Sequence, residues 1–218
     1  MDKKLLYYAG IFSVISYLLA DIIGGIITPN YSYTANAISE LSQAGAENRI
    51  LISSFFLFSA IMGILFAIGI ISHHPYKQSK LICIGGILLI IMGIFSALIG
   101  TIFPMDPIDG ATTFAGTMHL VLVASSAVLI FPALLMIGIG FYKEKNWKSF
   151  RLYTFISVLI IFISGGLSAV VIANGIELMG IVERVTIYTY LLWIFVLAYK
   201  LIREQPSQVS NFKERKEA

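Results

Sequence analysis

The sequence predicts an all-α, polytopic integral membrane protein, built as a six-transmembrane-helix bundle. The first observation is composition, because 58% of the 218 residues are hydrophobic and only 12% are charged, with a mean hydropathy of +0.88. A water-soluble domain could not cover that much apolar surface. The second is that the apolar runs are continuous over about 20 residues, whereas strands of a membrane β-barrel alternate over roughly 10. Both observations favour helices.

Six apolar stretches are each long enough to cross a bilayer as a helix. A helix rises ~1.5 Å per residue and the hydrocarbon core is ~30 Å thick, so about 20 residues suffice. We expect one transmembrane domain over residues 1–203 and a polar cytoplasmic tail over residues 204–218. The expected helices cover residues 5–27, 50–72, 81–103, 118–142, 152–173 and 185–202.

The stretches have distinct features along the chain. The first is interpreted as a retained helix, not a cleaved signal peptide, because it is long, contains Asp21 and is followed by no small-x-small cleavage site. The fourth contains Pro132, which removes one helix hydrogen bond and predicts a kink. Three stretches have small residues that let neighbouring helices approach closely. These are Ser59, Gly63 and Ala67 in the second, Gly93, Ala97 and Thr101 in the third, and Ser164 and Ser168 beside Gly165 and Gly166 in the fifth.

The basic residues indicate the orientation of the bundle. Of the 15 Lys and Arg, 13 fall on the side of the two termini, and only Arg49 and Arg184 fall on the other. The positive-inside rule then predicts a multi-pass protein of the cell membrane with both termini cytoplasmic, which an even number of spans also requires. The net charge of +3 is thereby explained by topology. We expect membrane lipids as partners and no nucleic acid, and a homo-oligomer stays open.

The longest connection on the extracytoplasmic side covers residues 28–49. Ser32 or Thr34 is a candidate N-cap there, Ile38 and Leu41 fall on one helical face, and Gly45 is a suitable stop. This pattern predicts a short helix lying at, or dipping into, the outer interface.

Asp21 is the most informative ionisable residue inside a predicted span. It lies six residues before the end of the first stretch, which is roughly 9 Å along the helix axis. A charged carboxylate costs about 2.5 kcal/mol or more at the bilayer centre, so Asp21 must face protein or water, be paired, or be protonated. A functional carboxylate and a structural hydrogen bond both fit this position.

Glu183 and Arg184 directly precede the sixth stretch. An acidic residue in the first turn of a helix is favoured by the helix dipole, which explains Glu183, but the same dipole disfavours Arg184. Two roles stay open for Arg184. One is an internal salt bridge, to Asp21, Glu40 or Asp106, and the other is recognition of a phosphate group, which a guanidinium binds with two hydrogen bonds.

His119 opens the fourth stretch and follows Asp106 by thirteen residues. An ordinary imidazole pKa of ~6.5 suits proton transfer, and a nearby carboxylate would orient the ring. The alternative is an interfacial histidine whose ring binds a loop carbonyl. Metal binding is not expected, because the only other histidines, His73 and His74, are adjacent and point about 100° apart on a helix.

These residues define one candidate ligand-binding face, and no cofactor or metal is expected in it. Candidate catalytic residues within it are His119 and Asp106. The full candidate set is Asp21, Ser39, Glu40, Asp106, His119, Glu183 and Arg184. Convergence of the set requires a compact bundle.

Several short motifs on this face resemble those of a prokaryotic six-helix membrane family, domain of unknown function 998. They are Asp21, Tyr31-Ser32, Asn36-Ala-Ile-Ser-Glu-Leu41, Phe103-Pro-Met-Asp106, His119 and Glu183-Arg184. The resemblance covers nearly the whole bundle and implies its topology, but no activity. The Ile-Ser-Glu segment and the histidine are also loosely similar to the Frag1/DRAM/Sfk1 membrane proteins, a group associated with lipid distribution and autophagy.

Three functions fit these observations. The first is a non-enzymatic lipid-handling protein whose extracytoplasmic pocket binds a headgroup, with Arg184 on the phosphate. The second is an intramembrane lipid-modifying enzyme in which His119 is the general base and Asp106 orients it. The third is a small-solute or proton-coupled transporter that uses Asp21 as proton carrier. The first is preferred, since no catalytic serine motif, His-Glu-x-x-His motif or inverted repeat is evident.

Overall fold

The fold consists of long antiparallel helices. The computed structural model describes residues 3–72, 79–108, 110–142 and 145–204. The His73–His74 pair, and all of the predicted tail after Glu204, lie outside these residues. The described elements are α1 (Lys3–Ile27), η1 (Ile38–Ser42), α2 (Arg49–Ser72), α3 (Lys80–Thr101), α4 (Phe114–Gly140), η2 (Lys145–Trp147), α5 (Lys148–Ala173) and α6 (Met179–Glu204).

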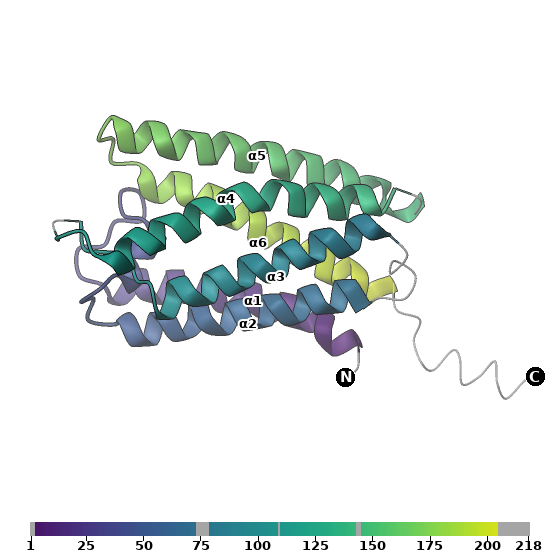
Figure 1. Cartoon of the computed structure of the whole chain (residues 1–218), viewed down its shortest axis with the longest axis horizontal. Coiled ribbons are helices and arrows are strands. Elements are labelled where there is room, and N and C mark those ends of the chain that lie inside the picture. The colour runs from purple at the N-terminus through teal and green to yellow at the C-terminus, as the bar shows by residue number, and fades with distance from the viewer. Residues whose placement is uncertain (1–2, 73–78, 109, 143–144, 205–218) are drawn as a thin grey trace, which may run out of the picture.

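The predicted fold class is confirmed. Within the described part of the chain, six α-helices are long and apolar enough to cross a membrane, and none of the elements is a strand. The chain is therefore a multi-pass membrane protein. The first residues of α1 and the last of α6 lie at one end of the bundle (Figure 1), while the cytoplasmic location of that end stays a prediction. The other end, which carries the connections 28–48, 102–113 and 174–178, is called the η1 end below.

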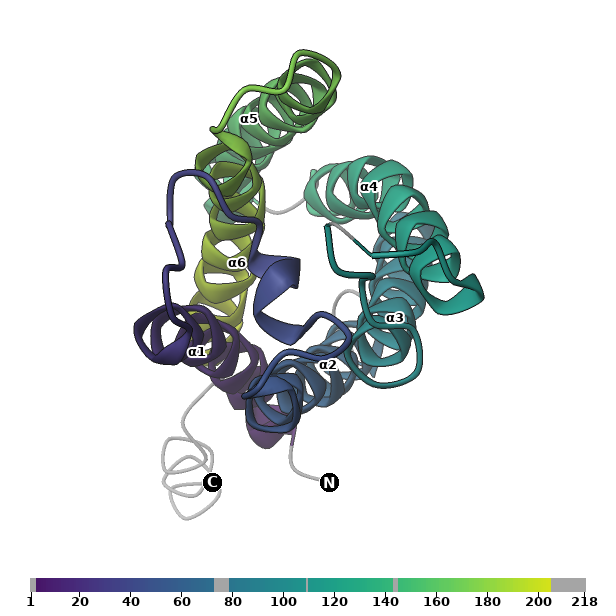
Figure 2. The ribbon, with the colours of Figure 1, turned by 90° about the vertical axis from the view of Figure 1, so that its left-hand side faces the viewer.

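The helices follow one another around an incomplete ring. Seen from the η1 end, the order is α5, α6, α1, α2, α3 and α4, with η1 inside the ring (Figure 2). Each helix packs on its neighbours in this order, and α4 also packs on α5. The α4–α5 contact lies far from the η1 end, where Gly138 faces Thr154 and Phe141 meets Phe150. Toward the η1 end the two helices separate.

The core is largest in the half of the bundle near the termini. Trp193 and Leu197 of α6 are fully buried there with Tyr7 of α1 and Phe66 of α2. The Trp193 indole donates a hydrogen bond to Thr154 Oγ1 of α5 at 2.9 Å. A smaller cluster lies under η1 and consists of Ala20, Ile38, Leu41, Ile52 and Phe56. The two clusters hold the ring from both ends.

Small and hydroxyl residues of α1, α2 and α3 lie at helix contacts, as predicted for the second and third stretches. The prediction is wrong for Gly165 and Gly166 of α5, where a Cβ would meet nothing within 4 Å. Ser13 Oγ of α1 donates to the Ser59 carbonyl at 2.8 Å, and Ser59 Oγ donates back to the Ser13 carbonyl at 2.9 Å. Gly93 of α3 packs against Ile64 of α2. In an apolar environment such close contacts and interhelical hydrogen bonds replace the hydrophobic effect as the source of association.

Helices α4 and α6 begin at Phe114 and Met179, earlier than the predicted starts at 118 and 185, and this changes the position of the candidate residues. Helix α4 begins at Phe114 because Thr113 caps it, its hydroxyl accepting a hydrogen bond from the Gly116 N–H. His119 therefore lies in the second turn. Helix α6 begins at Met179, so Glu183 also lies beyond the first turn, and the expected dipole explanation for it is wrong.

The predicted short helix in the first long connection exists, but its caps differ from the prediction. It is a 3-10 helix whose N-cap is Ala37, so the expected caps Ser32 and Thr34 are wrong. Its residues Ile38 and Leu41 are each only 1% exposed, because η1 plugs the ring and does not lie on its surface. The helix ends at Ser42 with Gln43 as its C-cap, so the expected stop at Gly45 is also wrong. Gly45 instead has a positive φ of 83° in the loop beyond the cap, a conformation that glycine adopts readily.

Glycine contacts give a direct test of the packing. A Cβ at Gly85 of α3 would lie 2.8 Å from the Ala133 carbonyl oxygen of α4, whereas a Cβ at Gly165 of α5 would meet nothing within 4 Å. We expect Gly85→Ala to destabilise the protein by about 1–3 kcal/mol through overpacking. Gly165→Ala, the matched control, should be neutral or slightly stabilising. Thermal unfolding in detergent measures both, and equal melting temperatures would contradict the α3–α4 packing.

Candidate functional site

A buried ion pair joins the first and last helices. The Arg184 guanidinium of α6 donates from Nε to Asp21 Oδ2 at 3.0 Å and from Nη2 to Asp21 Oδ1 at 2.7 Å. Asp21 is 0% exposed and Arg184 is 9% exposed. Charges removed from water cost several kcal/mol each unless they are paired and hydrogen-bonded, and the two-pronged geometry meets that requirement.

Asp21 also accepts a third hydrogen bond. Tyr188 Oη donates to Asp21 Oδ2 at 2.6 Å. Tyr188 lies one turn after Arg184 and so on the same face of α6. With three strong donors on it, the carboxylate is fully engaged inside the protein. The spacing of Arg184 and Tyr188 was available in the sequence, and Tyr188 was nevertheless missing from the candidate set.

The remaining N–H groups of Arg184 bind the connection between α1 and α2 and the first turn of α6. Its Nη1 faces the carbonyl oxygens of Tyr33, Gly180 and Asn36 at 2.7, 3.1 and 3.2 Å. Its Nη2 donates to Tyr31 Oη at 2.7 Å. All five guanidinium donors therefore have acceptors within the protein. Of the two roles left open for Arg184, the structure shows the internal salt bridge, and its partner is Asp21.

Two tyrosines of the same connection surround the guanidinium. The Tyr33 and Tyr31 ring centroids lie 4.8 and 5.6 Å from Arg184 Cζ. The Tyr31 hydroxyl accepts from Arg184 and donates to the Ala37 carbonyl at 2.9 Å. Burial raises the pKa of Tyr31 well above its ordinary value, which outweighs the lowering effect of Arg184. Tyr31 therefore stays protonated and keeps its donor role near neutral pH.

Two carboxylates satisfy the start of η1. Glu183 Oε2 accepts from the Ile38 N–H at 2.7 Å, and Glu40 Oε1 accepts from the Ala37 N–H at 2.7 Å. Glu40 Oε2 also accepts from Asn36 Nδ2 at 2.6 Å. The first N–H groups of a helix have no acceptor within the helix. Here the two carboxylates accept their hydrogen bonds in place of a capping side chain. We call Asp21, Tyr31, Glu40, Glu183, Arg184 and Tyr188 the Arg184 network.

Asp106 belongs to a different cluster, at the start of α4. Its Oδ2 accepts from the Thr113 N–H and its Oδ1 from the Thr113 hydroxyl, both at 2.7 Å. These two hydrogen bonds favour the charged form, so the pKa of Asp106 lies below its ordinary value. The carboxylate thus fixes the residue that caps α4.

His119 is oriented by a backbone carbonyl. Its Nδ1 lies 3.0 Å from the Phe103 carbonyl oxygen, and the side chain is only 4% exposed. Because a carbonyl only accepts, Nδ1 carries the hydrogen. Asp106, the residue expected to orient the ring, makes no hydrogen bond to it among the described residues. The structure therefore shows the alternative in which the histidine ring binds a loop carbonyl.

Six of the seven predicted residues fall into two groups. Asp21, Glu40, Glu183 and Arg184 converge in the Arg184 network, whereas Asp106 and His119 lie at the start of α4. Ser39 belongs to neither group and lies where the α1–α2 connection contacts the α3–α4 connection. Its hydroxyl lies 3.3 Å from Met105 Sδ. In the same two connections, the Ala44 N–H donates a hydrogen bond to the Met105 carbonyl. Within the described residues, no hydrogen bond or ion pair joins the two groups directly.

A groove at the η1 end includes the other basic residue of this end. It lies between α2 and α3, has a volume of about 310 Å³ and is lined by Arg49, Ile50, Ser53, Ser54, Leu57, Gly100 and Thr101. Arg49 Nη2 donates to the Thr101 carbonyl at 3.2 Å, and its other donors have no partner among the described residues. Ser53 Oγ is buried and likewise lacks a partner there. The sequence prediction noted Arg49 but gave it no role.

A family model described as "Protein of unknown function (DUF998)" matches residues 11–200. The chain belongs to this family. The match covers α2 to α5 in full and most of α1 and α6, and it includes every residue of the Arg184 network. No curated protein and no solved structure matches, and the looser similarity to the Frag1/DRAM/Sfk1 proteins has no support from the comparisons. Membership fixes the family but assigns no activity to it.

The buried pair predicts a strong non-additivity. Asp21→Asn or Arg184→Gln alone leaves one buried charge unpaired, and we expect each to lower the free energy of unfolding by about 3–5 kcal/mol. The double variant should lose much less than the sum of the two. Equilibrium unfolding in mixed micelles measures this, with the exposed Arg203→Gln as control. Additive losses would contradict the pairing.

The Asp106–Thr113 interaction predicts a local acid transition. Since the folded-state pKa of Asp106 is lowered, its stabilisation is complete above the ordinary Asp pKa of ~3.9 and is lost as the pH falls through the lowered value. We expect amide exchange in the first turn of α4 to increase in that acidic range, after correction for the intrinsic rate. In Asp106→Asn the faster exchange should already be present at neutral pH, while Glu177→Gln should behave like wild type. An unchanged first turn in Asp106→Asn would refute this role.

Proposed function

We propose that this protein binds a phospholipid at the η1 end of the bundle and holds it without changing its covalent structure. The observation that carries the proposal is the groove between α2 and α3, which places a guanidinium with free N–H groups above an apolar wall. The positive-inside pattern predicts that this end faces the extracytoplasmic leaflet. A phosphate at the membrane surface and an acyl chain below it match that arrangement.

Arg49 replaces Arg184 as the residue for the phosphate. Arg184 was the expected headgroup ligand, but its donors are all used by Asp21, Tyr31 and loop carbonyls. Arg49 uses one donor on Thr101 and keeps the others. A guanidinium binds phosphate through two parallel N–H···O bonds, which makes Arg49 the better candidate.

Ser53 supports a polar ligand near Arg49. A buried hydroxyl without a partner destabilises a protein by about 1–3 kcal/mol, so its presence in a groove requires an explanation. Ser53 lies one turn after Arg49 on α2 and lines the same groove. A glycerol ester or phosphate oxygen of a bound lipid would satisfy it.

The enzyme and transporter alternatives receive less support from the geometry. The enzyme requires His119 and Asp106 to act together, yet each is bound to another partner, Phe103 and Thr113. The transporter requires Asp21 to exchange protons, but its carboxylate accepts three hydrogen bonds within a buried ion pair. Binding without chemistry is the function that uses the groups left free.

Photo-crosslinking tests the proposal. In nanodiscs that contain phosphatidylglycerol with a photoactivatable group near the phosphate, we expect crosslinks to residues 49–57 and 100–101. Arg49→Gln should reduce this crosslinking by roughly tenfold or more, because hydrogen bonds to charged groups contribute about 1.5–3 kcal/mol. Arg151→Gln is the matched control, since Arg151 donates to the Tyr142 backbone carbonyl near the opposite end. Equal crosslinking in Arg49→Gln, or crosslinks at the Arg184 network, would overturn the proposal.

A further inference from the structure

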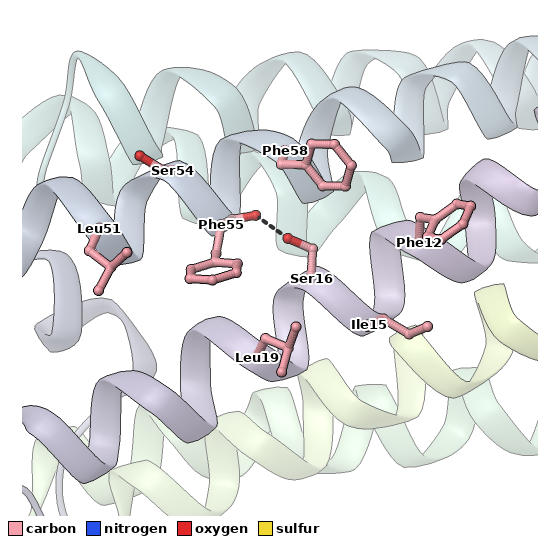
Figure 3. A pocket seen from close by; sticks show the side chains of 8 residues that line it. All are labelled: Phe12, Ile15, Ser16, Leu19, Leu51, Ser54, Phe55 and Phe58. Carbon is pink, nitrogen blue, oxygen red and sulfur yellow. Dashed lines mark hydrogen bonds between the residues drawn. The ribbon is translucent and has the colours of Figure 1, made fainter.

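A second groove lies on the other side of α2. Figure 3 shows it between α1 and α2, lined by Phe12, Ile15, Ser16, Leu19, Leu51, Ser54, Phe55 and Phe58, and its volume is about 430 Å³. Its walls face outward from the ring, since Phe12 and Phe58 are 53% and 47% exposed. Within a multi-pass membrane protein this groove opens toward hydrocarbon.

The groove offers no free polar group to a ligand. Ser16 Oγ donates to the Phe55 carbonyl at 2.7 Å, as the dashed line in Figure 3 marks, and Ser54 Oγ donates to the Ile50 carbonyl at 2.7 Å. The remaining lining is aliphatic and aromatic. The chemistry that fits such a surface is an acyl chain, held by many weak dispersion contacts.

The two grooves share a boundary. Ser54 lines both of them, and it is exposed on the outward face of α2. Its small side chain forms a low ridge between the α1–α2 groove and the α2–α3 groove. Arg49 lies just over one turn before Ser54, at the end of α2 nearest the membrane surface. One headgroup at Arg49 is therefore placed beside two adjacent grooves, of which the α1–α2 groove is mainly apolar and the α2–α3 groove has both polar and apolar lining.

We infer that the ligand is a glycerophospholipid with two acyl chains, one on each side of Ser54, and with its phosphate at Arg49. This inference rests on the proposed function and adds the number of chains. Two chains joined through one glycerol lie side by side, so the low ridge at Ser54 lets a single lipid occupy both grooves. A lipid with one chain would leave one groove without its contacts.

Native mass spectrometry with three probes tests the inference. Dioleoyl phosphatidylglycerol has two chains and a phosphate, its lyso form has one chain, and dioleoylglycerol has no phosphate. We expect the diacyl phospholipid to bind roughly tenfold tighter than either of the others. Equal binding of the diacyl and lyso forms to the wild type would overturn the inference.

Groove-filling variants give the matched comparison. Leu51→Trp fills the α1–α2 groove alone and should reduce diacyl affinity to the lyso level without changing lyso affinity. Ile61→Trp is the control, because Ile61 is an exposed residue of α2 that lines neither groove. Retention of the full diacyl preference in Leu51→Trp would refute the second chain site.

Arg49→Gln distinguishes a failure of the two-chain inference from a failure of the proposed function. If it weakens both the diacyl and lyso forms while Leu51→Trp has no effect, the proposed function stands and the two-chain inference fails. If it changes neither form, the proposed function itself fails.

Discussion

The buried pair between Asp21 and Arg184 is the interaction on which the rest of the η1 end depends. It joins α1 to α6, and the same guanidinium binds two carbonyl oxygens and Tyr31 of the α1–α2 connection, together with the Gly180 carbonyl of α6. Through Glu183, the residue beside Arg184, α6 also binds the Ile38 N–H at the start of η1. An unpaired charge buried in the protein would be strongly destabilising. We therefore expect the Asp21–Arg184 pair to form together with the closure of the α1–α2 connection around it.

This arrangement divides the ionisable residues of the η1 end by task. The Arg184 network and the Asp106–Thr113 cluster hold loops, and their donors and acceptors bind one another. Arg49 stands apart, because it keeps free donors beside a buried hydroxyl and an apolar groove. Among the described residues of this end, Arg49 is therefore the basic side chain with donors left for the proposed lipid.

The sequence was sufficient for the fold class because the length and hydropathy of each span are local properties. It also placed Asp21, Glu40, Glu183 and Arg184 on one face, and these residues do converge. It could not pair them, since Asp21 and Arg184 are 163 positions apart and Glu40 and Asp106 were equally good partners for the arginine. His119 binds the Phe103 backbone carbonyl and makes no hydrogen bond to Asp106 among the described residues. The position of a backbone carbonyl depends on the folded loop and cannot be inferred from the pattern of side chains. The grooves depend on how neighbouring helices pack, which is likewise not a local property.

The most direct test of the central claim is a cryo-electron microscopy structure of the protein in nanodiscs that contain phosphatidylglycerol. The account predicts phosphate density at Arg49, chain density on both sides of Ser54 and an Arg184 guanidinium still bound to Asp21. Phosphate density at Arg184, with Asp21 displaced from it, would contradict the division between a structural network and a separate lipid site.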